Sequence, residues 1–460
     1  MEVESSISCF EEENESTEEY DSVLPHKEFN LNDTDDAISR MFHMKPVHSI
    51  AIGKCIGIRD EARGEQSQEV RASASAPQLK ARIIASGDES NQVKIWNSLT
   101  GTQYFHESGH NDTVISCGFS FDGEYLASAA MDGTVQIRQM TGLVACTPSL
   151  EDDGENDDND DAKQERGSLK NKAFPPPQGL PLSSPSSSSL SPSTTTRMLT
   201  GMAEINWLSW HPKGYFLAVG DIDGNIWLWD ARKGECVSIL PGSAGSTTGG
   251  WSSDGRFLIG GYANGEVLVW SPRSVQILHR FSNAVGAGKR PSLLHFGFAM
   301  DEVTCLRCHN GENVFLVGSK NGNVFLCNAN TGDVLGRMPS HNGSVELLDF
   351  VDEGCNVVAT GGTDGIARVY DIQEHFVCGE YRHPEAVTCG LTYRASDGER
   401  VRNLLFTGCS DGLTRVWGID DAACLKELNG ISACVLCIKG KGNWIVAGGD
   451  DHTAVAFAIS

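Results

Sequence analysis

The sequence predicts an all-β fold, a propeller of eight blades with four short strands each. A tight Asp-Gly or Asn-Gly turn recurs at positions 132, 223, 264, 321, 364 and 411, with degenerate copies at Ser90-Asn91 and Asp451-His452. Several of these turns are 41 to 47 residues apart, a period typical of propeller blades. Ala203–Gly234 holds three apolar runs separated by turns, a meander too small to bury its own faces. Seven blades is the alternative, if the first segment forms none.

Particular residues in these segments resemble the WD40 repeat. Trp229-Asp230 matches the WD pair and Gly109-His110 the GH pair of that family. WD40 blades contain a hydrogen-bond network of His, Ser or Thr, Asp and Trp, in which buried polar groups satisfy one another. The resemblance assigns this structural network to blade two (His110, Ser128, Asp132), blade six (His341, Thr360, Asp364, Tyr370) and blade seven (His383, Thr407, Asp411, Trp417).

Two blades depart from that pattern. Blade two has Arg138 where the Trp is expected, and blade three has Val219 in place of the hydroxyl. We expect both blades to depend on apolar packing instead.

Three longer runs carry a second resemblance: INWLSWHP in blade three, GGYANGEVLVW in blade four and the terminal GGDDHTAVAFAIS. They are similar to the angio-associated migratory cell protein family, and the resemblance extends over residues 36–460. The fungal member of that family is a dedicated chaperone of a large-subunit ribosomal protein. The resemblance therefore implies a WD40 propeller over 36–460 that binds a basic ribosomal protein.

The negative charge is concentrated in two segments. The formal net charge is −25, yet residues 1–36 alone hold thirteen acids and one lysine, and Glu151–Asp161 adds eight acids. Blocks of like charge are usually solvated and disordered, so we predict a disordered acidic tail at 1–35. This balance makes nucleic acid a poor direct partner.

Composition also suggests a compartment. The N-terminus lacks the basic and apolar regions of a signal peptide, and no run of about 18 apolar residues predicts a membrane span. Fifteen cysteines without a framework fit free thiols in a reducing compartment. We expect a cytoplasmic monomer, with a nuclear pool as the alternative.

Taken in order, the chain begins its propeller near residue 36. Ile38–Met44 is predicted as the outer strand of the last blade, which closes the ring because the C-terminal blade ends after its third strand. Val47–Ile58 is predicted as the inner strand of blade one, 59–80 as a polar insertion, and Arg82–Trp96 as the middle strands.

Low-complexity segments interrupt the repeat. Residues 148–200, acidic and then rich in Ser and Pro, are predicted as a disordered insertion between blades two and three. As a link from an outer to an inner strand, it should emerge on the same face as the turns between second and third strands. The insertion at 59–80 and the tail should lie toward the opposite face. A shorter excursion is expected at Ser282–Pro291.

The motifs for metal or covalent chemistry are weak. Cys305-Leu306-Arg307-Cys308-His309 matches the haem attachment pattern, and Cys434–Cys437 is a second CxxC. Residues i and i+3 of a strand point to opposite faces, so neither pair converges on one metal. We predict no metal, no cofactor and no enzymatic activity.

The remaining function is binding. Residues that open inner strands line one rim of a propeller, and carboxylates clustered around a channel mouth suit a Lys- and Arg-rich peptide. An aromatic side chain could stack on an Arg, although Trp207 could equally belong to the core. The predicted partner-binding residues are Asp112, Glu204, Trp207, Asp221, Asp301, Glu302, Glu385 and Asp450.

Three functions stay open at this point. The first is a chaperone of a basic large-subunit ribosomal protein, implied by the family resemblance and the acidic rim. The second is a general scaffold or signalling adaptor. The third is a substrate receptor for a cullin ubiquitin ligase, since Trp229-Asp230-Ala231-Arg232 fits the WDxR pattern.

Overall fold

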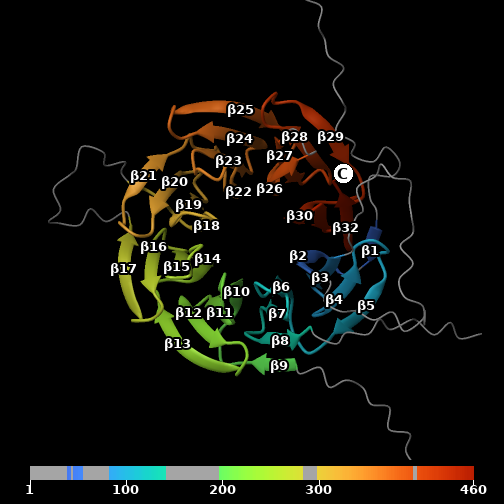
Figure 1. Cartoon of the computed structure of the whole chain (residues 1–460), viewed down its shortest axis with the longest axis vertical. Coiled ribbons are helices and arrows are strands. Elements are labelled where there is room, and N and C mark those ends of the chain that lie inside the picture. The colour runs from blue at the N-terminus through green and yellow to red at the C-terminus, as the bar shows by residue number, and fades with distance from the viewer. Residues whose placement is uncertain are drawn as a thin grey trace, which may run out of the picture.

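The computed structural model describes residues 39–42, 45–54, 82–140, 196–282, 298–396 and 401–459, and their regular structure consists of strands. Eight four-stranded antiparallel sheets form a ring around a central opening (Figure 1). This confirms the propeller and its eight blades. Within those ranges no helix is long and apolar enough to cross a membrane.

The first four blades are listed from the inner strand outward. Blade one contains β2 (Val47–Lys54), β3 (Arg82–Asp88), β4 (Val93–Asn97) and β5 (Gln103–Glu107); blade two β6 (Val114–Phe119), β7 (Tyr125–Ala130), β8 (Val135–Gln139) and β9 (Thr196–Leu199); blade three β10 (Ile205–Trp210), β11 (Phe216–Asp221), β12 (Asn225–Asp230) and β13 (Glu235–Pro241); blade four β14 (Ser246–Trp251), β15 (Leu258–Tyr262), β16 (Val267–Ser271) and β17 (Gln276–Phe281).

The other four blades repeat this order. Blade five contains β18 (Val303–Cys308), β19 (Val314–Ser319), β20 (Val324–Asn328) and β21 (Val334–Arg337); blade six β22 (Val345–Phe350), β23 (Val357–Gly362), β24 (Ile366–Asp371) and β25 (Phe376–Arg382); blade seven β26 (Val387–Ser396), β27 (Val401–Cys409), β28 (Thr414–Gly418) and β29 (Cys424–Leu428); blade eight β30 (Val435–Lys441), β31 (Trp444–Gly449), β32 (Thr453–Ala458) and β1 (Ser39–Phe42).

The ring closes through the N-terminal strand. β1 pairs antiparallel with β32, with Ser39 opposite Ala456 and Phe42 opposite Thr453. The predicted closure is therefore confirmed, and the edge that β32 would otherwise expose is covered.

Successive strands of a blade are antiparallel, so the connections alternate between two faces. We call upper the face with the turns between second and third strands and the links into the next inner strand. The lower face carries the turns from first to second and from third to outer strands. Inner strands run from the upper to the lower face.

The predicted position of the long insertion is wrong. β9 pairs with β8, with Val135 opposite Leu199 and Arg138 opposite Thr196, so the outer strand of blade two follows the insertion. The segment from 141 to 195 joins the third strand to the outer strand and leaves from the lower face, not between blades two and three from the upper one. The apolar face of β8 is covered by this fourth strand, so the insertion is not the link from an outer to an inner strand that the sequence predicts.

Several expectations lie outside the described residues. These are the disorder of the 1–35 tail and of most of 148–200, the insertion at 59–80, and nearly all of the excursion at 282–291.

The core lies between blades rather than within them. One cluster joins blades two and three through Val135, Ile205 and Trp229, and another joins blades eight and one through Trp444 and Trp96. Each sheet thus buries both faces against its neighbours, which is why a single blade is not stable alone.

Candidate partner-binding face

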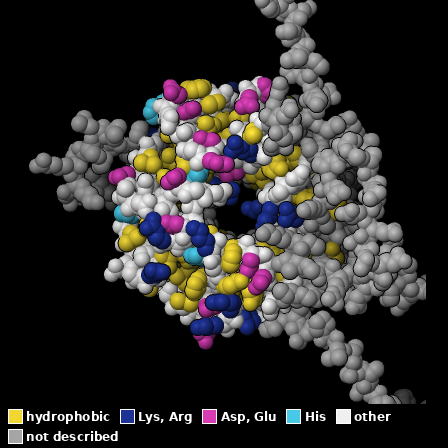
Figure 2. Space-filling model, viewed as in Figure 1, with side chains coloured by type: hydrophobic (Ala, Val, Ile, Leu, Met, Phe, Trp, Pro, Cys, Tyr) yellow, Lys and Arg dark blue, Asp and Glu magenta, His cyan; other side chains and the backbone are white. Residues whose placement is uncertain are grey.

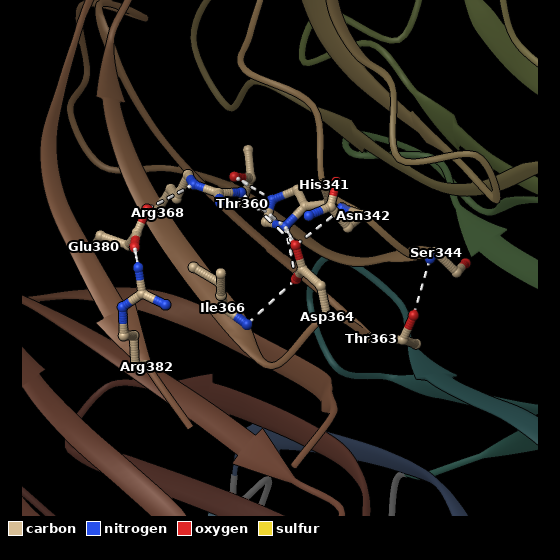
Figure 3. A network of polar contacts seen from close by, with 10 residues as sticks. All are labelled: His341, Asn342, Ser344, Thr360, Thr363, Asp364, Ile366, Arg368, Glu380 and Arg382. Atoms are coloured by element: carbon tan, nitrogen blue, oxygen red, sulfur yellow. Dashed lines mark hydrogen bonds and ion pairs between the residues drawn. The ribbon is translucent and has the colours of Figure 1, made fainter. Parts of the chain in front are cut away.

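A polar network in blade six fixes an upper turn (Figure 3). The His341 ring lies 3.0 and 3.2 Å from the Asp364 carboxylate oxygens through Nδ1, and 2.9 Å from the Thr360 hydroxyl through Nε2. Asp364 also accepts the backbone N–H groups of Asn342, at 3.0 Å, and of Ile366, at 3.2 Å. The carboxylate thereby ties the link before β22 to the turn between β23 and β24.

Tyr370, assigned to the same network, packs in the apolar cluster between blades five and six. Arg368 approaches the network instead, at 3.2 Å from His341 Nδ1, and is held by Glu380 at 3.2 Å. Burial lowers the pKa of His341 and so favours the neutral ring. The Asp364 carboxylate opposes this shift in part.

Blade seven contains a partial version. The Thr407 hydroxyl lies 2.8 Å from His383 Nε2 and accepts the Trp417 indole N–H at 2.9 Å. Asp411 accepts instead from Arg415, at 2.7 Å, and among the described residues the buried Nδ1 of His383 has no hydrogen-bond partner. Arg415 therefore replaces the histidine as the partner of Asp411.

Blade two extends the network by one hydroxyl. His110 lies 2.8 Å from Ser128 through Nε2 and 2.8 Å from the Thr134 hydroxyl through Nδ1. That hydroxyl donates to Asp132 at 2.6 Å, and Asp132 accepts the N–H of Asn111 at 2.6 Å. As in blade six, the aspartate ties the preceding link to the upper turn.

The same backbone bond organises the upper face of every blade. The residue after the second strand donates its N–H to the carbonyl of the residue before the inner strand, for example Ile222 to Glu204 at 2.8 Å and Asp450 to Cys434 at 2.9 Å. We define the upper rim as the two residues before each inner strand together with the turn between its second and third strands.

This upper rim is strongly acidic. Its basic residues are Lys45 and Lys320. Its thirteen acidic residues are Glu89, Asp112, Asp132, Glu204, Asp223, Glu266, Asp301, Glu302, Asp364, Glu385, Asp411, Asp450 and Asp451. The rim therefore gathers the carboxylates of all eight blades around one mouth of the channel.

Most of the predicted partner-binding acids lie on this rim. Asp112, Asp301, Glu385 and Asp450 are exposed, and Glu204 is half-buried. Glu302 pairs with Lys320 at 2.8 Å, so its charge is partly compensated.

Two predicted partner-binding residues are wrong, because their side chains point into the propeller. Asp221 is 1 % exposed and accepts the Trp227 indole N–H at 2.7 Å and the N–H of Asn225 at 2.8 Å. Trp207 is 7 % exposed and donates to the Ser246 hydroxyl at 2.9 Å. Both occupy strand positions, where the pleat rather than the turn sets side-chain direction.

A further acid, Glu346, was missed by the sequence reading. All eight inner strands contain a β-bulge between their first and third residues. The second residue in several blades donates to the carbonyl of the first residue in the next inner strand: Asn206 to Ser246 at 2.9 Å, Thr247 to Val303 at 2.6 Å, Thr304 to Val345 at 2.7 Å, and Thr388 to Val435.

Glu346 holds this second position in blade six and is the acidic member of the set. It is half-buried, and burial raises its pKa, while the Ser344 hydroxyl opposes that rise. In its ionised form the carboxylate cannot donate to a carbonyl, so in that form this position in the channel wall favours an N–H donor from outside. The signal available in the sequence was a lone Glu two residues into an inner strand.

The cysteine motifs do not assemble a metal site. Cys305 packs in the cluster between blades five and six, and Cys308 in that between blades four and five, so the two thiols face opposite sides of one sheet. Burial raises the pKa of Cys308 to about 12. Across the ranges that the structure describes, no group of three or more His, Cys, Asp or Glu residues could hold a metal ion.

Comparison with known proteins agrees with the fold. The family profile described as "WD domain, G-beta repeat" matches residues 101–138, and that of the "Anaphase-promoting complex subunit 4 WD40 domain" matches 198–248. The angio-associated migratory cell protein of Homo sapiens is 22 % identical over 397 residues, which cover 82 % of this chain and 75 % of the relative.

Solved propellers superpose over nearly the whole chain. Sqt1 of Saccharomyces cerevisiae matches with a TM-score of 0.65 and 16 % identity, covering 92 % of this chain and 99 % of that one. Sqt1 of Chaetomium thermophilum, solved bound to the N-terminus of the ribosomal protein L10, matches with a TM-score of 0.64 and 18 % identity, covering 92 % of this chain and 100 % of that one.

Proposed function

Because this chain is a WD40-repeat propeller homologous to the angio-associated migratory cell protein, we propose that it is a chaperone for a basic large-subunit ribosomal protein. The upper rim holds a Lys- and Arg-rich segment of that client, keeps it soluble and releases it during ribosome assembly. Binding and release need only a difference in affinity between two states, so no catalytic group is required. The proposal includes a monomer in the cytoplasm that makes no direct contact with nucleic acid.

The observation that carries the proposal is the charge of the upper rim, where thirteen acids accompany two lysines. Carboxylates placed around one mouth add their fields, which attract and orient a basic segment. The C. thermophilum Sqt1 structure with the L10 N-terminus supports the end of a ribosomal protein as the kind of client.

The rim offers two kinds of contact. The exposed Asp112, Asp301, Glu385 and Asp450 suit salt bridges with flexible Lys and Arg side chains. Glu346 lies deeper, in the channel wall. A client ammonium or guanidinium there supplies the hydrogen-bond donor that a Thr hydroxyl or the Asn206 amide supplies in other blades. A desolvated charge pair of this kind contributes more than one at the rim.

The test is affinity purification of the tagged protein from its own cytosol, followed by mass spectrometry. We expect one stoichiometric basic ribosomal protein at about 50 mM salt that is lost at about 500 mM, as the Debye length shrinks from roughly 14 to roughly 4 Å. Glu204→Lys should release the same protein at low salt.

Glu374→Lys is the matched control, because Glu374 is exposed in a lower turn between β24 and β25. This variant should retain the client. Recovery of a ubiquitin-ligase adaptor or of many signalling proteins, or equal loss in both variants, would contradict the proposal.

A further inference from the structure

The acidic N-terminal segment joins the propeller at its lower face. Thr453 follows the upper turn of blade eight, and Phe42 pairs with it, so Phe42 marks the upper end of β1. Ser39, opposite Ala456, marks the lower end. Residues 1–38, with thirteen acids and one lysine, therefore precede a strand that starts on the face away from the acidic upper rim.

At the lower mouth of the channel, cations outnumber acids at the fifth position of the inner strands. The fifth residues of the eight inner strands are Ala51, Gly118, Ser209, Gly250, Arg307, Asp349, Leu391 and Lys439. Two are cations, and Lys441 adds a third positive charge two residues further along β30. In the view of Figure 2, Lys and Arg side chains lie beside the central opening, and Asp and Glu side chains also border it.

The single acid at this level is already occupied. Asp349 is 6 % exposed and accepts from Arg307 Nε at 2.9 Å. Its second oxygen accepts the N–H of Thr392 at 2.8 Å and the Thr392 hydroxyl at 3.0 Å. This carboxylate therefore accepts three donors from blades five and seven, and within the described ranges the Lys439 ammonium forms no ion pair with it.

Lys439 and Arg307 also lie close enough to repel each other. Loss of water around the Lys439 ammonium is the larger cause that lowers the pKa of Lys439, and the positive charge of Arg307 is the second. Both residues are nevertheless exposed on the channel side. An anion placed between the two would relieve this repulsion.

The acidic run can reach this mouth within its own chain. Ser39 lies on the outer strand of blade eight and Lys439 on the inner strand, three strand spacings or about 14 Å apart. The run Glu11–Asp21 ends 18 residues before Ser39. An unstructured chain of 18 residues spans about 23 Å on average, which exceeds this distance, so the length of the chain permits the contact.

We propose that the cationic lower mouth, formed by Arg307, Lys439 and Lys441, is the docking site of the acidic N-terminal run Glu11–Asp21 of the same chain. The contact neutralises the lower mouth and holds the acidic tail away from the upper rim. It lies on the face opposite to the proposed client site, so either interaction can fail without the other.

The test is zero-length carbodiimide cross-linking of the full chain, which joins a lysine to a carboxylate in direct contact, followed by peptide mass spectrometry. We expect cross-links from Lys439 or Lys441 to acids of Glu11–Asp21 at low salt, reduced at least about fivefold at 500 mM salt. Lys320 and Glu302, paired at 2.8 Å, provide a positive control within each sample.

The double substitution of Lys439 and Lys441 to Gln should abolish the preferred cross-links of the tail to the lower mouth. Lys213→Gln, on an exposed lysine of another lower turn, should leave the yield of the Lys439 and Lys441 cross-links unchanged. Three results would overturn the proposal. The first is that tail cross-links are spread equally over Lys213 and Lys233. The second is that no tail cross-link forms although the Lys320–Glu302 product does. The third is that the products join isotopically distinct chains, which would place the tail on a second copy.

Discussion

The upper rim and the lower turns of this propeller are built by the same repeat and differ in charge. The upper rim contains thirteen acids and two lysines, whereas the described lower turns contain ten acids with five bases, Lys213, Arg232, Lys233, Arg256 and Arg273. Propeller folding requires particular backbone turns at both faces but no particular net charge. Acids exceed bases on both faces, but the excess on the upper rim is about twice as large, and this difference is what motivates the proposed client site there.

Local hydrogen bonding accounts for part of this contrast. Asp132, Asp364 and Asp451 accept backbone N–H groups from the preceding links, so part of the upper charge is structural. The exposed Asp112, Glu385 and Asp450 remain as additional charge. The two faces are thus best compared by substitutions of the same kind at matched positions.

The largest effect is expected at Glu346. Losing one member of a desolvated charge pair costs about 2–5 kcal/mol, so Glu346→Gln should weaken a Lys- and Arg-rich client peptide by at least about 30-fold. The new amide can donate to the next blade as Asn206 does, so the melting temperature should not fall. Fluorescence anisotropy and thermal melting measure the two quantities, and unchanged affinity in a folded variant would remove Glu346 from the site.

An intermediate effect is expected from a pair of turn aspartates. Asp364, in an upper turn, accepts the N–H groups of Asn342 and Ile366 and contacts His341. Asp352, in a lower turn, accepts those of Asn356 and Val357 at 3.0 Å each. Asp364→Ala should lower the free energy of unfolding by about 1–3 kcal/mol, because it removes the acceptor of the two N–H groups and the partner of the buried His341 ring.

Hydrogen exchange separates the two faces. In Asp364→Ala the Asn342 amide should exchange faster and client affinity should fall, whereas Asp352→Ala should accelerate Asn356 and Val357 and leave the affinity unchanged. Equal loss of client affinity in both variants would mean that general destabilisation, not the upper rim, controls binding.

Sequence alone predicted the repeat well because the turns have strict chemistry. Asp-Gly and Asn-Gly pairs need a left-handed residue, and Gly224, Gly265 and Gly365 have φ values of 91°, 78° and 74°. Ring closure by residues near Ile38–Met44 followed from the missing outer strand of the last blade. Both inferences rest on local patterns that a single chain displays.

The errors arose where tertiary context decides. Thr196–Leu199 is too short to be recognised as an outer strand after the low-complexity run, so the insertion was assigned to the wrong connection. Asp221 and Trp207 sit one or two residues inside strands, where a small shift in register decides between rim and core. Glu346 was missed because a bulge, invisible in the sequence, turns the second residue of each inner strand toward the next blade.

The smallest effect is expected from single exposed acids. Asp450 lies on the upper rim and Asp420 in a lower turn, and both are exposed. An exposed charge pair contributes about 0.2–1 kcal/mol, so Asp450→Asn should weaken the basic peptide by roughly 1.4- to 5-fold at low salt and not at high salt. Asp420→Asn should have no effect at either salt concentration. If the two variants weaken binding equally, long-range net charge rather than the upper rim attracts the peptide, and the contrast between the faces would carry no information about where the client binds.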